Sequence, residues 1–160
     1  MSYTNYQKAI NLLPKCKNYF VFKKQPPNVI KKAEQLLSLN FSMQVSDFLM
    51  KLGYVSFAGH EIYGISGDNF DDFSILAGNM VESTLSDREK FGLPNEWLTI
   101  YFFGFDGYYG YLDHGQLNEE GEPPVIIATY DGEKYVVAEK VAEDFGDFLL
   151  ELVQNALSEK

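Results

Sequence analysis

The sequence predicts an α+β domain in which a central, antiparallel-rich mixed β-sheet is wrapped by helices. Three observations predict this class. Apolar residues repeat at helical spacing in the first third of the chain, glycine-punctuated aromatic and β-branched runs occupy the middle, and one amphipathic segment closes it. Helices that precede a run of strands, without regular alternation, favour an antiparallel sheet.

The first third of the chain contains three predicted helices. The first covers Thr4–Leu13, where apolar residues recur at i, i+4 and i+7. The second opens after two consecutive prolines with Asn28 as its N-cap, because an asparagine oxygen can accept from the free amides of a first turn. The third begins after Ser42 and ends at Gly53, since glycine tolerates the left-handed conformation that follows a helix.

The pattern changes after the third helix. Phe57–Ile65 is predicted to be one glycine-punctuated strand, and Asp68–Asp72 an acidic turn. Phe73–Leu85 is predicted to be a helix, although Gly78 weakens that assignment.

Two further strand pairs and a closing helix complete the prediction. The strands are Trp97–Phe103, Tyr108–Leu112, Val125–Thr129 and Lys134–Ala138, and the helix is Ala142–Leu157. The Asp106-Gly107 dipeptide suits the turn of the first pair, because both residues tolerate positive φ.

Length and composition favour one globular domain over residues 1–160, with an N-terminal helix and basic connection in 1–27 and the core in 28–157. A content of 46% hydrophobic and 16% aromatic residues excludes a disordered chain. The single cysteine, Cys16, excludes a disulfide framework. The sequence has no run of 18 apolar residues and no secretory signal at its start, so we expect a cytoplasmic protein that does not span a membrane.

Charge is distributed unevenly along the chain. Residues 1–34 carry seven lysines and one acid, a net charge of +6, whereas the remaining residues carry six bases and 22 acids, a net charge of −16. An acidic body repels phosphate backbones, so direct nucleic-acid binding is disfavoured. The same field would attract a cationic partner and speed its encounter. The alternative is that the excess acid only keeps the protein soluble.

The sequence contains no assembled catalytic or metal-binding set. His60 precedes Glu61 and His114 follows Asp113, but neighbouring residues in a strand point to opposite faces, so neither dipeptide forms a pair. Cys16 lies between two lysines that favour a thiolate, yet no histidine is near it in sequence. We therefore expect no enzyme activity, no metal and no cofactor.

Acid pairs and tyrosines are the remaining unusual features. The acid pairs are Asp71-Asp72, Glu119-Glu120 and Glu143-Asp144, and they lack the spacing of a calcium loop. They are solvated acids unless folding places two across a cleft, as a glycosidase requires. Tyr108, Tyr109 and Tyr111 would occupy both faces of one strand. They indicate either a protein interface, where rigid aromatic area combines with steering charge, or a sheet covered on both faces.

The order of motifs from Asn28 to Leu152 resembles the SUKH superfamily, which includes bacterial immunity proteins, the Syd protein and a yeast cell-wall-synthesis regulator. The matching motifs are Ile30-x-x-Ala33-Glu34-x-x-Leu37, Phe48-Leu49-x-x-Leu52-Gly53, Gly59-His-Glu-Ile-Tyr-Gly64, Pro124-Val125 before a strand, and Ala142-Glu-Asp-Phe145-Gly-Asp-Phe148-Leu149. Two features depart from the family pattern: Phe41-Ser42 replaces a typical Leu-Pro, and an aromatic residue expected near Val45 is absent.

The resemblance implies a non-enzymatic, protein-binding α+β domain, most concretely a bacterial immunity protein, or antitoxin, that neutralises a cationic toxin such as a nuclease. We predict partner contacts from loops and hairpin ends, at Asp106, Tyr108, Asp113, Glu119, Glu120, Glu122 and Asp131. Two alternatives stay open. One is an intracellular adaptor or regulator of the cell-wall-synthesis type, and the other is a hydrolase built on clustered carboxylates.

Overall fold

The computed structural model of the chain describes residues 2–65, 79–104 and 107–158. The helices are α1 (Ser2–Leu12), α2 (Pro27–Leu37), α3 (Met43–Lys51), α4 (Met80–Phe91) and α5 (Phe145–Ser158). The strands are β1 (Phe20–Val21), β2 (Val55–Phe57), β3 (His60–Ile62), β4 (Trp97–Phe102), β5 (Tyr109–Asp113), β6 (Val125–Tyr130) and β7 (Tyr135–Ala142). None of the helices in the described part of the chain is long and apolar enough to cross a membrane.

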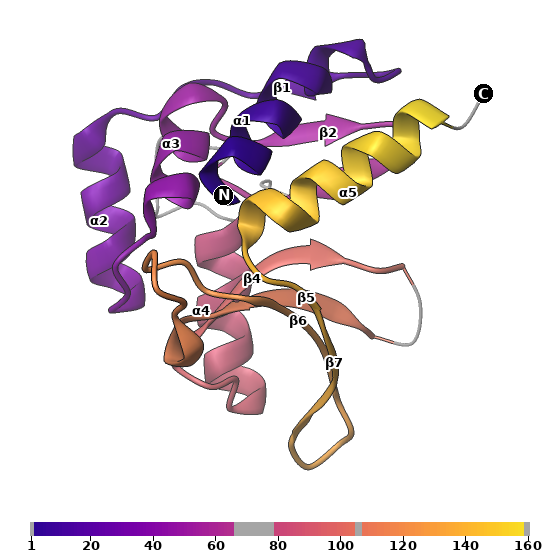
Figure 1. Ribbon diagram of the computed structural model, residues 1–160. Helices are drawn as coiled ribbons and strands as arrows, with labels where there is room; N and C mark the ends of the chain where they lie inside the picture. The colour runs from indigo at the N-terminus through magenta and orange to yellow at the C-terminus, as the bar shows by residue number, and fades with distance from the viewer. Residues whose placement is uncertain (1, 66–78, 105–106, 159–160) are drawn as a thin grey trace.

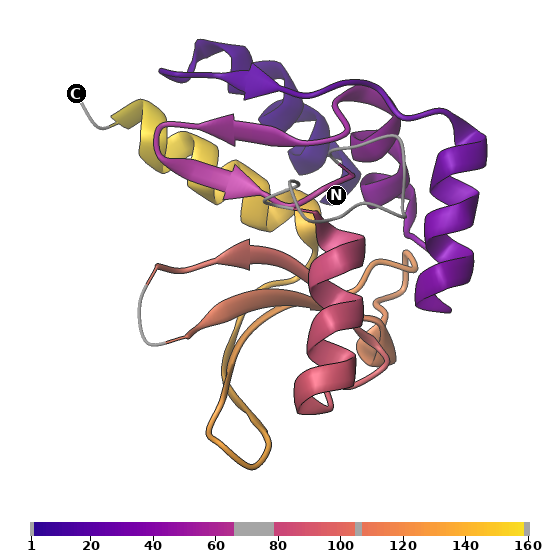
Figure 2. The ribbon, with the colours of Figure 1, turned by 180° about the vertical axis from the view of Figure 1, so that it is seen from behind.

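The predicted α+β class is confirmed, but the strands form two sheets where a single central one was expected. One antiparallel sheet has the order β1-β2-β3 and the other has the order β4-β5-β6-β7. The two sheets meet where the Tyr63 amide donates to the carbonyl of Ile100 at 2.9 Å. Helix α5 runs between the two sheets in Figure 1, and α4 stands against the four-stranded sheet in the reverse view of Figure 2.

Two helix starts follow different rules. Ser42 caps α3 as predicted, because its hydroxyl accepts from the Val45 amide at 3.3 Å. The prediction that Asn28 caps α2 is wrong: the cap residue is Pro26, and Asn28 lies inside the first turn. A proline at the first helical position already has helical φ and lacks the amide that a cap would satisfy, so the helix begins two residues earlier than predicted.

Three boundaries differ from the predictions. Phe57–Ile65 is not one strand, because Ala58 and Gly59, with φ of 49° and 85°, form the turn of the β2–β3 hairpin. Helix α4 begins at Met80 and continues to Phe91; Asp68–Asp72 and the first six residues of the predicted Phe73–Leu85 helix lie outside the described residues.

The two later strand pairs are confirmed as antiparallel hairpins, β4–β5 and β6–β7, and β5 also pairs with β6. The closing helix starts at Phe145, three residues later than predicted, because β7 continues to Ala142. Asp144 then caps α5, accepting from the Asp147 amide at 2.9 Å.

Both faces of the four-stranded sheet are covered, at least in part. On one face, Leu98, Ile100 and Leu112 belong to the main core, which also contains side chains of α1, α3 and α5. On the other face, Trp97 and Tyr111 form a second cluster with Leu93, Ile126 and Ala128. Tyr111 is only 1% exposed, so the covered-sheet alternative is correct for this residue.

Residues 1–27 are packed into the same body as the rest of the chain. Tyr6 of α1 is fully buried, and its ring lies 6.2 Å from that of Phe145 in α5. The Tyr6 hydroxyl donates to Asp47 at 2.7 Å, and the Asn5 amide donates to Asp147 at 2.8 Å. The N-terminal helix is therefore a structural part of the core.

Candidate partner-binding surface

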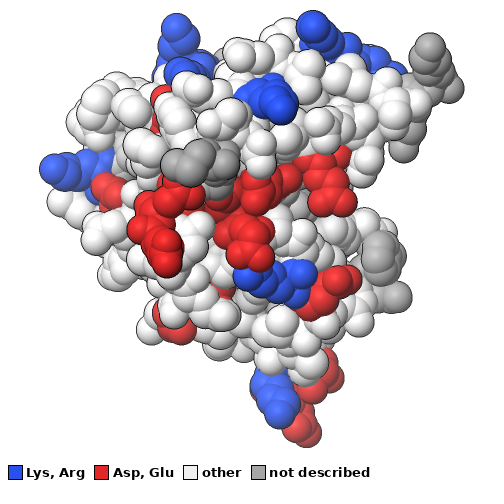
Figure 3. All heavy atoms as spheres, in the orientation of Figure 1, with Lys and Arg blue, Asp and Glu red and all other residues white. Residues whose placement is uncertain are grey.

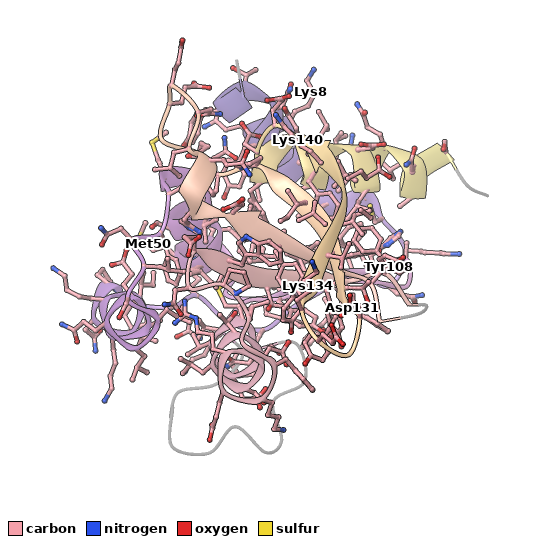
Figure 4. All side chains as sticks on the ribbon, turned by 90° about the horizontal axis from the view of Figure 1, so that it is seen from below. Lys8, Met50, Tyr108, Asp131, Lys134 and Lys140 are labelled. Atoms are coloured by element: carbon pink, nitrogen blue, oxygen red, sulfur yellow. The ribbon has the colours of Figure 1, made fainter. Side chains whose placement is uncertain are left out.

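The predicted contact residues are divided between opposite ends of the four-stranded sheet. Tyr108 follows the β4–β5 turn and Asp131 follows β6, which places both at one end, as Figure 4 shows. Asp106 lies outside the described residues. Asp113 at the end of β5 and the three glutamates of the connection from β5 to β6 lie at the opposite end, about 17 Å away along a five-residue strand. The six described residues therefore do not form one continuous surface.

Two of the predicted contacts are buried and have structural partners. Asp113 is 6% exposed and accepts from the Gly115 amide at 2.9 Å and the Gln116 side chain at 2.6 Å. Glu122 is 2% exposed and accepts from the Gln44 amide at 3.3 Å. Neither carboxylate presents an appreciable surface to a partner.

The other predicted acids are exposed. Glu119 and Glu120 lie on the surface of the β5–β6 connection. Asp131 accepts from the amides of Glu133 and Lys134 at 2.8 and 2.9 Å, so it shapes the β6–β7 turn, and these two donors lower its pKa.

His60, His114 and Cys16 have separate surroundings. The His60 Nδ1 atom lies 2.7 Å from the Tyr101 hydroxyl, and the His114 Nδ1 atom lies 3.1 Å from the Glu96 carbonyl oxygen. Burial lowers the pKa of His114 and raises that of Cys16, which favours the neutral form of each. Within the described part of the chain, no three histidine, cysteine or acidic side chains are grouped so that they could hold a metal ion.

A groove that the sequence did not reveal runs between β7 and α5. It consists of two adjoining hollows of about 380 and 330 Å³, which share Lys140, Val141 and Glu151. We call it the β7–α5 groove. Its four carboxylates are those of Glu139, Glu143, Asp147 and Glu151, and its apolar side chains include Phe103, Val141, Phe148 and Leu152.

The fold positions these carboxylates from two elements. Asp147 and Glu151 are four residues apart, so they lie on the same face of α5. Glu139 and Lys140 are exposed on β7, which is an edge strand because it ends the order of its sheet. Lys140 pairs with Glu143 at 2.9 Å, and both side chains are largely exposed, so this pair is weak.

The groove is strongly acidic. Four carboxylates and one lysine give it a net charge of −3. In Figure 3, acidic side chains form a band across the middle of the face on which α5 lies, and basic side chains lie at the upper margin, at the left edge, below the band and at the lower tip. The acidic side chains of this face thus gather in one region, and the basic side chains are spread around it.

Part of this groove was visible in the sequence. The i, i+4 spacing of Asp147 and Glu151 on the polar face of the predicted closing helix was a local signal. The position of β7 beside that helix has no local signal in the sequence, because it depends on how the last strand and the last helix are joined.

The chain belongs to the SUKH superfamily, because residues 28–149 match a family model described as SMI1-KNR4 cell-wall. Domains of this superfamily are protein-interaction modules. The match confirms the resemblance found in the sequence, and no curated protein matched the chain.

Proposed function

We propose that this protein is an immunity protein that binds and neutralises a cationic protein toxin in the cytoplasm without catalysing a reaction. The observation that carries the proposal is the β7–α5 groove, where four carboxylates surround an apolar floor next to an edge strand. Membership of the SUKH superfamily supports an immunity-protein or SMI1-KNR4-like domain.

Each feature of the groove has a role in such binding. The carboxylates attract a cationic partner from a distance and speed its encounter. The exposed edge of β7 offers backbone amides and carbonyls to an extended segment of the partner. Phe103 and Leu152, which are half-buried, offer apolar area at the bottom of the groove, where burial contributes most of the affinity.

A nuclease is the toxin class that best fits this surface. A nuclease must present basic residues to the phosphates of its substrate, and those residues are complementary to an acidic groove. An acidic protein bound there competes with the nucleic acid for the same positive surface. This is why we place a nuclease ahead of other cationic toxins.

Co-expression with the toxin encoded beside this gene tests the proposal. The wild-type protein is expected to restore growth and to co-purify with the toxin. A Glu139→Lys/Glu151→Lys double variant should lower the association rate about ten-fold at low salt, and added salt should reduce the difference.

A Glu89→Lys/Glu133→Lys variant is the matched control, since it makes the same change in net charge at exposed positions outside the groove. Equal loss of association in both variants would show that total charge matters and the groove does not. Failure of the wild-type protein to protect cells or to co-purify would reject the immunity function.

A regulator of cell-wall synthesis is the second candidate. It is favoured by the description of the matching family as SMI1-KNR4 cell-wall. Affinity purification from the native cell distinguishes the two functions: a regulator would retain components of cell-wall synthesis, and its gene would have no toxin gene beside it.

A further inference from the structure

A second pocket, away from the β7–α5 groove, lies against the four-stranded sheet. It has a volume of about 220 Å³, and α4 and strands β5, β6 and β7 line it. We call it the Asp87 pocket; the side chains that matter are those of Asp87, Phe91, Tyr109, Tyr111, Tyr130 and Tyr135. A pocket of this size is below the range for drug-sized ligands, about 300 Å³ and above, and suits one side chain.

The walls of the pocket are aromatic rings packed against one another. Phe91 and Tyr130 have ring centroids 4.9 Å apart, Tyr130 and Tyr135 are 5.3 Å apart, and Tyr111 and Tyr135 are 6.1 Å apart. Behind them, the ring of Trp97 lies 5.2 Å from that of Tyr111. Mutual packing holds the rings in place before any ligand arrives.

Asp87 is the acid among these rings. Its side chain is half-buried, and it has neither a hydrogen bond nor an ion pair with any of the described residues. Burial, together with the nearby carboxylate of Glu82, raises the pKa of Asp87, and the charge of Lys90 partly offsets this shift. Burial also raises the pKa values of Tyr109 and Tyr135, and the Asp87 carboxylate, which lines the same pocket, adds to both shifts.

A half-buried carboxylate with no hydrogen bond or ion pair loses part of its hydration without compensation, and a cation that pairs with it directly relieves that cost. Ring faces also attract a cation through the negative charge of their π-electrons. A guanidinium group satisfies both requirements, because it is planar, stacks on aromatic rings and pairs with a carboxylate through two parallel hydrogen bonds. An ammonium group is a point charge and is more strongly hydrated, so it gains less from the same walls.

The entrance of the pocket is accessible from outside. Phe91 is 43% exposed at its edge. The pocket also includes Gly107 and Tyr130, which are the neighbours in sequence of two residues predicted to contact a partner, Tyr108 and Asp131. A protein that approaches this end of the sheet can therefore insert a side chain.

We propose that the Asp87 pocket receives an arginine side chain of a partner protein, with the guanidinium group stacked against the tyrosine rings that line the pocket and paired with the Asp87 carboxylate. The proposal deepens the proposed function, since it rests on the partner being a cationic protein, and it adds an anchor point on the sheet distinct from the groove.

NMR titration of the full chain with a short capped peptide, Gly-Arg-Gly, tests the proposal. We expect the arginine peptide to shift the ring resonances of Tyr109, Tyr130 and Tyr135. A Gly-Lys-Gly peptide should bind more weakly, and a peptide with neutral citrulline in place of arginine should not bind. Asp87→Asn should lower the affinity for the arginine peptide at least five-fold. Glu89→Gln is the control with the same charge change, because Glu89 is exposed on the same helix and outside the pocket.

Equal binding of the citrulline or lysine peptide, or an unchanged affinity in the Asp87→Asn variant, would overturn the proposal. If thermal unfolding shows that Asp87→Asn does not fold, Phe91→Ala at the exposed entrance takes its place and should also lower the affinity for the arginine peptide. The test uses no toxin. Arginine binding by a protein that does not protect cells would reject the proposed function alone, and protection without arginine binding would reject the pocket alone.

Discussion

At the scale of single residues, a buried polar cluster joins the starts of α3 and α5. Gln44, Glu122 and Asp144 are at most 2% exposed. The Gln44 side chain accepts from the Gly146 amide at 2.7 Å and donates to Asp144 at 3.4 Å, while its backbone amide donates to Glu122. Each helix N-terminus thus has a carboxylate beside its free amides, which is the favourable arrangement for the helix dipole.

Glu122 makes stability depend on pH. Burial, with a further contribution from Asp144, raises the pKa of Glu122 above its usual value of 4.5. The folded protein therefore resists loss of this proton more than the unfolded chain does. The associated stabilisation is complete below the unfolded pKa and is lost as the pH rises through the higher folded pKa.

The variant Glu122→Gln removes this titration. As the pH is raised from about 4 to about 7, the free energy of unfolding of the variant should increase relative to that of the wild type, so the variant becomes relatively more stable. Urea unfolding of both proteins at each pH measures the difference. Glu119→Gln, which removes a carboxylate at an exposed position in the same connection, is the control. A pH-dependent difference for Glu122→Gln that is no larger than that of the control would contradict the prediction.

At the scale of elements, the close contact of α1 with α5 depends on one glycine. A Cβ atom on Gly146 would lie 2.6 Å from Cβ and 2.8 Å from Cα of Tyr6. These distances are shorter than real carbon contacts, and the backbone of α1 cannot rotate away as a side chain can. The absence of a side chain at this position sets how near the two helices come.

Gly146→Ala should therefore destabilise the protein, although alanine is normally the better helix former. We expect a loss of about 1 to 3 kcal/mol in the free energy of unfolding, measured with urea, because α1 must move outward. Gln154→Ala, at an exposed site on the same helix, should change the stability by less than about 0.5 kcal/mol. A stabilised Gly146→Ala variant would show that α1 adjusts freely.

The elements that sequence predicted well are those whose signals are local. Ser42 and Gly53 mark the limits of α3, and the turn before Tyr108 separates two short runs rich in aromatic residues. Glu122 illustrates the opposite case. An acid in a loop has the local signature of a solvated residue, and only the distant start of α3 buries it. The groove was missed for the same reason, because β7 and α5 meet through tertiary structure.

For the molecule as a whole, the family match begins at residue 28, yet the N-terminal segment completes the core. Tyr6, Ala9 and Leu13 are fully buried, and they cover the face of α5 that contains Phe145. Removal of residues 1–27 would expose that face to solvent.

A chain that lacks residues 1–27 should lose cooperative unfolding and bind a hydrophobic dye, because no remaining element can cover the exposed apolar face of α5. Near-UV circular dichroism and dye fluorescence measure both effects. Tyr6→Phe is the control: it keeps the ring and loses only the bond to Asp47, so its unfolding should stay cooperative. A truncated chain with native near-UV signal would refute the prediction.

The bond between Asn5 and Asp147 spans 142 positions of the chain, so α1 is synthesised well before the helix that it contacts. At about 5 to 20 residues per second, the delay between the two residues is about 7 to 30 seconds. Throughout this interval the apolar side of α1 lacks its native contacts with α5, so this part of the core can form only after α5 has been synthesised.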